Sequence, residues 1–179
     1  MVTHRIDQSA VIAALRSAAP YIRLYKGKIF VIKAGGAVFG DTTATRALIE
    51  QIAIPHYFGV RVVFVHGGGP QINRMLDKLA VKAEFRNGLR VTDAETMSVV
   101  EMVLAGSINK SIVASIQQAG GRAVGISGKD GNLLVAERYT KKKTNPETGK
   151  EEVIDFGFVG EPARVNTEIL ETIMKSDAI

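Results

Sequence analysis

Short apolar runs alternate with amphipathic segments along most of this chain. Residues 28–32 (KIFVI) form a run rich in β-branched residues, and helical periodicity follows from about residue 43 to residue 58, before the stop signal Gly59. A second run, residues 60–65 (VRVVFV), precedes another segment whose apolar residues recur at helical spacing. Strands that alternate with helices in this way predict a parallel sheet covered on both sides.

A third helix and a third strand are expected next. Residues 92–95 (TDAE) form a capping box, so we expect a helix to begin at its threonine and to continue to about Gln118, bent or interrupted near Gly106. Residues 122–126 (RAVGI) then predict another strand. This strand would lead into a further glycine-containing loop, residues 127–131 (SGKDG).

The pattern changes after this loop. Residues 133–139 and 152–158 predict two antiparallel strands around a polar connection, which carries turn signals at residues 145–146 and 148–149. A last helix is expected with Asn166 as its cap.

The two ends of the chain predict its division into parts. Residues 8–25 form an amphipathic segment ahead of the first strand, which Pro20 should kink or interrupt. The chain stops at residues 178–179, where a strand–helix pattern would begin its next strand, so we expect it to be cut short. We therefore expect an N-terminal helical extension over residues 1–26 and a ligand-binding part over residues 27–179.

Composition narrows the classes of protein to consider. The 179 residues are 46% hydrophobic and 23% charged, which is ordinary for a globular domain. The chain has no cysteine, which excludes disulfides, cysteine-based zinc sites and a thiol nucleophile and fits a cytoplasmic protein. No uninterrupted apolar stretch approaches the ~20 residues of a membrane-spanning helix, and the start of the chain lacks the apolar core of a signal peptide.

The positive charge is a weaker guide. A net charge of +5 suits anionic ligands in general and also permits nonspecific contact with nucleic acid. The basic run 141–143 (KKK) has no aromatic residues between its lysines, so it predicts a solvated hairpin tip better than a nucleic-acid patch.

Two glycine loops directly follow the first two expected strands, at residues 33–36 (KAGG) and 66–70 (HGGGP). Glycine lets backbone N–H groups approach an oxyanion, and a following helix adds the positive end of its dipole. The glycines could instead only make tight turns, but two such loops at equivalent positions favour a ligand site. Neither loop matches the Walker or the dinucleotide-binding pattern, so a P-loop ATPase or a Rossmann dehydrogenase is not expected.

Three side chains near these loops are candidates for chemistry. Lys33 ends the first strand, where its ammonium could neutralise charge on a transferring phosphoryl group. Arg90 lies just ahead of a helix and could grip a carboxylate, although a surface ion pair explains its position equally well. His66 has no partner at ligand spacing, so a structural role that fixes the glycine loop is the better interpretation.

Four motifs in order and spacing carry a family resemblance. The chain resembles the N-acetylglutamate kinases of the amino-acid kinase superfamily at residues 31–36 (VIKAGG), 65–72 (VHGGGPQI), 87–93 (NGLRVTD) and 125–131 (GISGKDG). The resemblance implies a three-layer αβα sandwich with a mainly parallel central sheet, whose N-terminal part binds N-acetyl-L-glutamate.

The resemblance also implies roles for single residues. Lys33 matches the lysine that stabilises the transferring phosphoryl group, and Arg90 matches the arginine that holds a substrate carboxylate. Gly68 and Gly69 match glycines that contact substrate through their backbone. The remaining glycines of the two loops are expected to contribute backbone N–H groups: Gly35, Gly36 and Gly67.

The reaction implied by the resemblance is ATP-dependent phosphorylation of the side-chain carboxylate of N-acetyl-L-glutamate, in arginine biosynthesis. A carboxylate with a pKa of about 4 is already ionised near neutral pH, so no general base is needed. ATP, with Mg²⁺, would bind a C-terminal half that this chain does not include. The N-terminal segment resembles the helix that joins dimers into hexamers in arginine-inhibited members, so a homodimer or hexamer and inhibition by arginine are expected.

Two alternatives stay open. One is the kinase-like domain of an N-acetylglutamate synthase or of a bifunctional synthase-kinase, although bacterial synthases generally lack the lysine at the Lys33 position and alter the glycine triplet. The other is a non-catalytic module that binds arginine or an acylamino acid.

Overall fold

Two parallel strands form the centre of the fold. The computed structural model describes residues 7–86, 88–144 and 151–179. β1 (Ile29–Ala34) and β2 (Arg61–His66) pair in parallel, in a register that places Lys33 opposite Val65. Both strands lie where the apolar, β-branched runs predicted them.

The pleat divides the side chains of β1 between two faces. Phe30, Ile32 and Ala34 point toward the helical core, whereas the alternate residues Val31 and Lys33 are exposed on the opposite face. This alternation follows from the period of two in a strand. Lys33 therefore projects from the side of the sheet that the core does not occupy.

Helices connect the strands as expected. α2 (Thr42–Tyr57) begins after Asp41, whose carboxylate accepts two N–H groups of the first turn. It ends before Gly59, which has a φ of +82° that favours glycine at a helix end. α3 (Gly69–Lys78) follows β2 and its glycine loop.

The third helix is interrupted where the sequence predicted. α4 (Ala94–Glu101), a π-helical segment η2 (Met102–Ile108) and α5 (Asn109–Gln118) form one helical run. The cap differs from the prediction, because Asp93 and not Thr92 is the N-cap and accepts the N–H of Thr96 at 2.8 Å. Thr92 instead pairs through its backbone with Phe156 and Phe158, which holds it in an extended conformation.

These helices bury one core against the sheet. By length and composition alone, the run Ala94–Gln118 would suffice to cross a membrane. However, one of its faces packs into the core of the protein, so we describe it as a core helix. The buried hydrophobic core lies between the inner face of the two strands and the helices. Its buried residues are Ile49, Ile52, Val60, Val62, Ile72, Leu76, Val99, Val103, Ile108, Ile112, Ile116 and Ile179.

The third expected strand is the main departure from the predicted sheet. Residues 122–126 are not a β-strand in the structure. They run beside the end of the chain, where Ile179 donates its N–H to Arg122 O at 2.9 Å and accepts the N–H of Val124 at 2.9 Å. A strand needs a longer paired neighbour, and Ile179 supplies a single residue of pairing.

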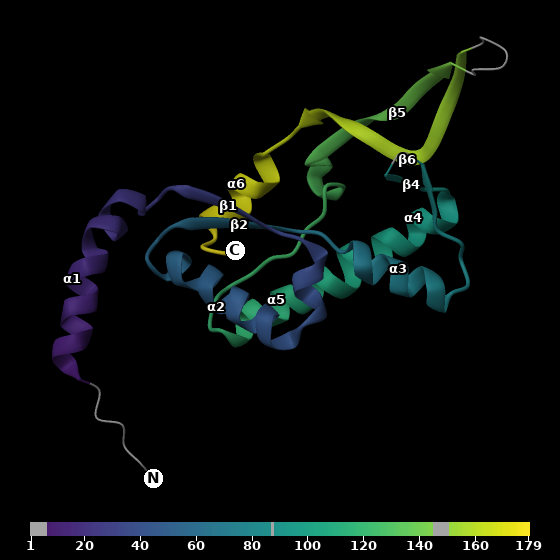
Figure 1. The fold of residues 1–179 in the computed structure, drawn as a ribbon. Helices are drawn as coiled ribbons and strands as arrows, with labels where there is room; N and C mark the ends of the chain where they lie inside the picture. Colours follow the sequence, from purple (N-terminus) through teal and green to yellow (C-terminus); the bar gives the residue numbers. More distant parts are fainter. Residues whose placement is uncertain (1–6, 87, 145–150) are drawn as a thin grey trace.

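The last part of the described chain is a long hairpin and a helix. β5 (Leu134–Thr144) and β6 (Glu151–Val165) are antiparallel, as predicted, and project from the body in Figure 1. The turn signals at residues 145–146 and 148–149 lie outside the described residues. α6 (Glu168–Lys175) follows. Its N-cap is Thr167 and not Asn166 as predicted, because the helix begins one residue later, although Asn166 Oδ1 still accepts the N–H of Glu168 at 3.2 Å.

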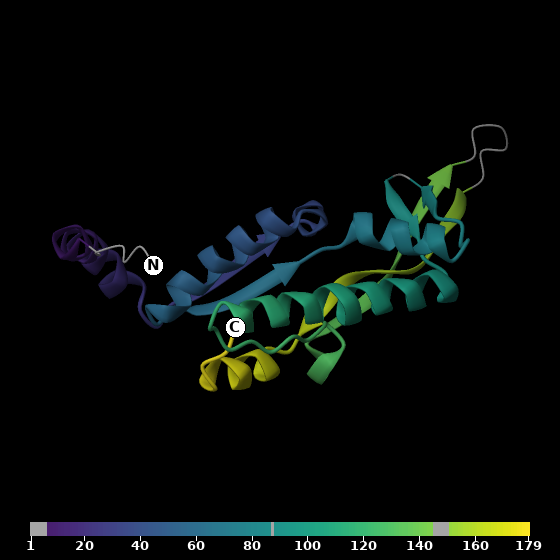
Figure 2. The same cartoon turned by 90° about the horizontal axis from the view of Figure 1, so that it is seen from below.

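The layers are those of an α/β fold. Figure 1 shows α2 and α5 on one side of β1 and β2, with α6 on the other side, and Figure 2 shows α6 displaced away from β1. The outer face of β1 is therefore open, and Ile29 and Val31 are 51% and 68% exposed.

The N-terminal segment forms a separate helix. α1 (Gln8–Tyr25) begins after Asp7, runs through Pro20 without interruption, and has no buried residue. Figure 1 shows it standing apart from the body of the protein. Its apolar residues Val11, Ile12, Leu15 and Leu24 are all exposed.

Candidate active site

The two glycine loops meet at the carboxyl ends of β1 and β2. Gly67 donates its N–H to Ala34 O at 3.1 Å, which continues the pairing of the strands into the loops. A Cβ atom on Gly36 would lie 2.7 Å from Gly68 Cα and 2.9 Å from Gly68 N. The loops are therefore in direct backbone contact, which only glycine at residue 36 permits.

Gln71 holds the two loops together. It lies in the first turn of α3, and its Nε2 donates to Gly36 O at 2.7 Å. Its Oε1 is buried and has no partner among the described residues. Gln71 lies within the motif at residues 65–72, but this contact could not be predicted from the sequence, because residues 36 and 71 are far apart in the chain.

The π-helical segment closes the inner side of the second loop. A Cβ atom on Gly68 would collide with Ile108 Cδ1 and would lie 2.7 Å from Leu104 Cδ2. Both side chains belong to η2. The π-helical segment thus packs directly against the loop, and a side chain at residue 68 would require the ends of Ile108 and Leu104 to shift.

The N-terminus of α3 faces this loop junction. Gly69 and Pro70 form its first residues, and the helix has ten residues, enough for a full N-terminal turn. Its free N–H groups and dipole favour an anion beside Gly68 and Gly69. Lys33, the last residue but one of β1, lies at the same edge of the sheet and is exposed on its outer face.

Arg90 is held beside α3 by two contacts. Its Nη2 donates a hydrogen bond to Asn73 Oδ1, and its guanidinium carbon lies 4.7 Å from the centre of the Phe85 ring. Its Nη1 is buried and has no partner among the described residues. A buried guanidinium nitrogen without a partner is costly, which suggests that an anionic group completes it.

His66 has a structural environment. Its Nδ1 lies 3.4 Å from Gly67 O, and its ring meets that of Phe39 edge-on at a centroid distance of 6.0 Å. Both contacts support the interpretation that His66 fixes the glycine loop.

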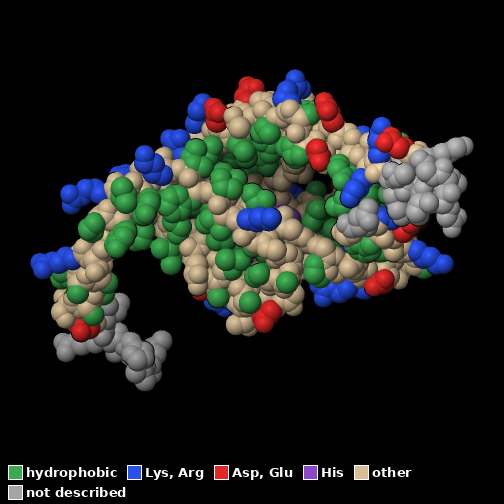
Figure 3. Space-filling view, turned by 45° about the horizontal axis from the view of Figure 1, so that its top comes forward, with side chains coloured by type: hydrophobic (Ala, Val, Ile, Leu, Met, Phe, Trp, Pro, Cys, Tyr) green, Lys and Arg blue, Asp and Glu red, His purple; other side chains and the backbone are tan. Residues whose placement is uncertain are grey.

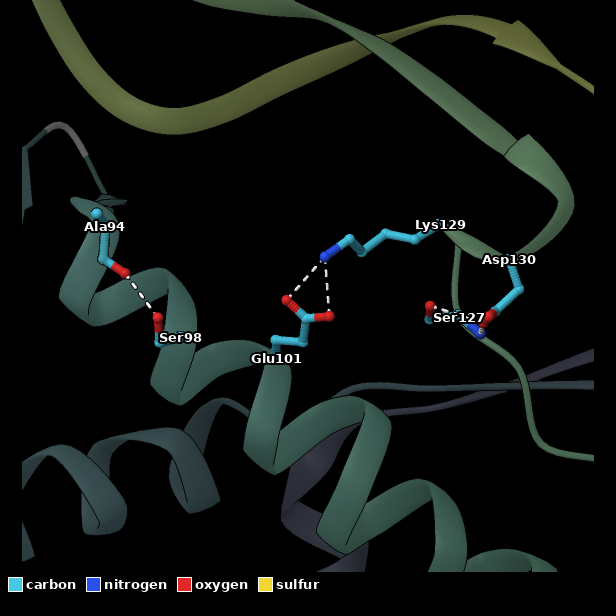
Figure 4. A network of polar contacts seen from close by, with 6 residues as sticks. All are labelled: Ala94, Ser98, Glu101, Ser127, Lys129 and Asp130. Atoms are coloured by element: carbon cyan, nitrogen blue, oxygen red, sulfur yellow. Dashed lines mark hydrogen bonds and ion pairs between the residues drawn. The ribbon is translucent and has the colours of Figure 1, made fainter.

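The third loop is braced by two carboxylates (Figure 4). Asp130 accepts the N–H of Ser127 at 2.6 Å and its hydroxyl at 2.9 Å, while Lys129 bonds both oxygens of Glu101 at 2.8 Å. The loop is thereby tied to the end of α4. The backbone N–H of Ser127, then its hydroxyl and the charge of Lys110, hold the pKa of Asp130 below its ordinary 3.8.

Acid should release this loop. Because the folded-state pKa of Asp130 is lowered, its stabilisation is present above the unfolded value of 3.8 and is lost as pH falls through the folded value. We expect Asp130→Ala to lower the free energy of unfolding at pH 7, and this difference from the unmodified chain to shrink below about pH 4. Urea unfolding at several pH values measures it. A difference that stays constant down to about pH 2.5 would contradict the assignment.

A groove opens beyond the free edge of β2. Among the described residues, β2 pairs only with β1. Its other edge borders a groove of about 580 Å³ whose opposite wall includes Val124 and Ile126, with Lys129 and Glu101 among the polar groups that line it. Figure 3 shows a hollow rimmed largely by hydrophobic side chains on this side of the molecule. This opening was not predicted from the sequence pattern.

Metal ligands are not grouped in the described part of the chain. No set of three or more histidine, cysteine, aspartate or glutamate side chains converges there.

Comparison with known proteins identifies the family. The model of the amino acid kinase family matches residues 28–179. The chain belongs to the amino acid kinase family. Within it, the chain is 51% identical to the acetylglutamate kinase of Rhizorhabdus wittichii over 165 residues, which cover 92% of this chain and 55% of that protein. It is 50% identical to the acetylglutamate kinase of Parvibaculum lavamentivorans, with 54% of that protein covered.

Solved structures share the fold of this amino acid kinase chain. N-acetylglutamate synthase from Neisseria gonorrhoeae, complexed with coenzyme A and N-acetyl-glutamate, superposes with a TM-score of 0.69 at 23% identity, over 94% of this chain and 36% of that one. The protein smu.665 of Streptococcus mutans gives 0.67 at 26% identity, over 84% of this chain and 56% of that one. The chain thus spans about half the length of the curated relatives it matches.

The structure gathers the predicted site residues at one edge of the sheet. Lys33 and the five predicted loop glycines lie at the carboxyl ends of β1 and β2, and Arg90 contacts α3 one turn beyond the second loop. Their roles stay predictions. The sequence pattern did not predict the contacts of Gln71, Asn73 and Phe85 with the site residues, because each joins segments that are separate in the chain.

Proposed function

We propose that this chain forms the N-acetyl-L-glutamate-binding part of an acetylglutamate kinase, which phosphorylates the side-chain carboxylate with ATP. The observation that carries the proposal is the buried Nη1 of Arg90, which has no partner among the described residues and belongs to a side chain bonded to α3, the helix whose N-terminus follows the two glycine loops in contact. The acetylglutamate kinases at about half identity support the choice of substrate.

Each part of the site then has a task. The guanidinium of Arg90 binds one carboxylate of the substrate. The other, reacting carboxylate lies at the glycine loops, where the N–H groups of Gly68 and Gly69 and the dipole of α3 orient it. One of its oxygens attacks the γ-phosphorus of ATP, the bond from that phosphorus to the bridging oxygen breaks, and ADP leaves. Lys33 neutralises the phosphoryl oxygens during transfer.

The nucleotide is expected to bind mainly outside this chain. ATP supplies the phosphoryl group, and Mg²⁺ would arrive on its phosphates, which need only one or two carboxylates from a protein. The chain's own contribution is to bind and orient the acceptor carboxylate. No base is required, because the carboxylate is ionised at neutral pH.

Two measurements test this function. Calorimetry on the chain itself should detect N-acetyl-L-glutamate, with at least roughly tenfold weaker binding of N-acetyl-L-glutamine, whose side chain lacks the second charge. The chain joined to the unmatched C-terminal part of the Rhizorhabdus wittichii enzyme should release ADP only when both ATP and N-acetyl-L-glutamate are present.

Other results would redirect the assignment. Equal binding of the two acylamino acids, or ADP release that does not depend on N-acetyl-L-glutamate, would contradict the proposal. Acetyl transfer from acetyl-CoA to glutamate would favour a synthase, which the likeness to the Neisseria structure does not decide because it concerns the fold alone.

A further inference from the structure

Two neighbouring side chains, Phe85 and Asn73, contact the guanidinium of Arg90 and leave one of its nitrogens without a partner among the described residues. Phe85 lies on the same hairpin, within β3 (Glu84–Arg86), and Arg90 lies in β4 (Leu89–Val91), directly opposite Phe85 in the antiparallel register. Cross-strand partners of this kind have side chains on the same face, so the ring can cover one side of the guanidinium. The distance of 4.7 Å is within the range of a cation–π contact.

The second neighbour comes from a different element. Asn73 lies in α3, four residues after Gly69, so it stands about one helical turn from the glycine loop. Its Oδ1 accepts from Nη2 of Arg90. This bond joins the β3–β4 hairpin to the helix whose N-terminus faces the loops.

We propose that Asn73 and Phe85 are positioning residues that hold the Arg90 guanidinium with its Nη1 free for a carboxylate of the substrate. The inference rests on the proposed function and extends it to two residues that do not themselves carry the reaction. Asn73 fixes Nη2 of Arg90, and the Phe85 ring fixes the plane of the guanidinium. Nη1, which is buried and has no partner among the described residues, is left as the donor.

The geometry explains why two contacts are needed. A guanidinium on a long side chain loses rotamer freedom when it binds, and this loss weakens the complex unless the side chain is ordered beforehand. A hydrogen bond alone permits rotation about its axis, and a stacked ring alone permits rotation in the plane. Together they leave one orientation, in which Nη1 is the open donor.

Both residues are exposed, so substitutions there spare the core. Asn73 lies on the solvent side of α3, and Phe85 is 53% exposed. Asn73→Leu keeps the size of the side chain but removes the acceptor, whereas Asn73→Asp keeps an acceptor in place. Phe85→Leu removes the aromatic ring, whereas Phe85→Tyr retains it.

The first measurement needs no ligand. Nitrogen-15 NMR of the arginine side chains, with the Arg90 signal identified by its loss in Arg90→Lys, reports how fast the guanidinium rotates. We expect slow rotation in the unmodified chain, and rotation roughly tenfold faster in Asn73→Leu and Phe85→Leu. Asn73→Asp and Phe85→Tyr should rotate as slowly as the unmodified chain.

The second measurement is the affinity for N-acetyl-L-glutamate by calorimetry. We expect Asn73→Leu and Phe85→Leu to bind roughly tenfold more weakly, with affinity retained in Phe85→Tyr. The control is Arg86→Ala on the same hairpin, since the guanidinium of Arg86 pairs with Glu84 at 2.7 Å. Arg86→Ala should leave both measurements unchanged.

The outcomes separate this inference from the proposed function. The positioning roles are overturned if the guanidinium rotates as slowly in Asn73→Leu and Phe85→Leu as in the unmodified chain. They are also overturned if it rotates as fast in Asn73→Asp as in Asn73→Leu, or if Phe85→Tyr loses as much affinity as Phe85→Leu. Absence of N-acetyl-L-glutamate binding in the unmodified chain, with rotation responding as expected, overturns the proposed substrate and leaves the arrangement around Arg90 standing.

Discussion

Lys33→Ala should lower phosphoryl transfer by roughly 10²–10³-fold while leaving the affinity for N-acetyl-L-glutamate nearly unchanged. The ammonium would act on charge that develops in the transition state, so its loss should appear in kcat. Lys33 is the last residue but one of β1 and lies on the outer face of the sheet, beside the loops that would hold the acceptor carboxylate. It carries no core contacts, so the fold should survive its removal.

The measurement uses the chain joined to the C-terminal part of the Rhizorhabdus wittichii kinase, with ADP release followed at saturating ATP. The matched control is Lys28→Ala, because Lys28 is an exposed lysine that directly precedes the same strand. Lys28→Ala should be as active as the unmodified protein. Full activity in Lys33→Ala would remove Lys33 from the mechanism.

Gly36→Ala should separate the two glycine loops. The added Cβ would lie 2.7 Å from Gly68 Cα and 2.9 Å from Gly68 N, and both atoms are backbone that cannot rotate away. Overpacking of this kind costs about 1–3 kcal/mol of stability. The hydrogen bond from Gln71 to Gly36 O would be strained as well, so binding of N-acetyl-L-glutamate should weaken by more than roughly tenfold.

A matched control lies at the other end of the same short helix. Gly40 ends η1 (Gly36–Gly40), and a Cβ atom there would meet nothing within 4 Å. Urea unfolding and calorimetry on both variants should therefore show the losses in Gly36→Ala alone. If Gly36→Ala binds and unfolds like Gly40→Ala, the loops are not in the contact described.

The local sequence pattern was sufficient to predict most of the helices and strands. Hydrophobic periodicity and stop signals correctly predicted β1, β2, α2 and the antiparallel pair β5–β6. These signals are local, because the buried face and the ends of an element depend on a few neighbouring residues. The π-helical interruption at Gly106 also follows from the local sequence. The predicted division into an extension over residues 1–26 and a binding part stays a prediction, as does the oligomeric state.

The predictions failed where a distant segment decided the outcome. Asp93, and not Thr92, is the N-cap of α4, because hydrogen bonds to β6 hold the backbone of Thr92 extended. Residues 122–126 lack a strand because, within the described part of the chain, their backbone pairs only with Ile179, and the free edge of β2 borders a groove. Neither result could be read from the residues concerned, since each depends on what lies across from them.

The sequence by itself determined the two glycine loops, their place after β1 and β2, and the kinds of side chain beside them. A loop's backbone freedom and a strand's direction are local properties, so Lys33 and the loop glycines could be named in advance. Only the tertiary structure decided that Gly36 touches Gly68, that Gln71 ties the loops, and that Asn73 and Phe85 hold Arg90. These contacts join residues brought together by packing, and packing is a property of the whole chain.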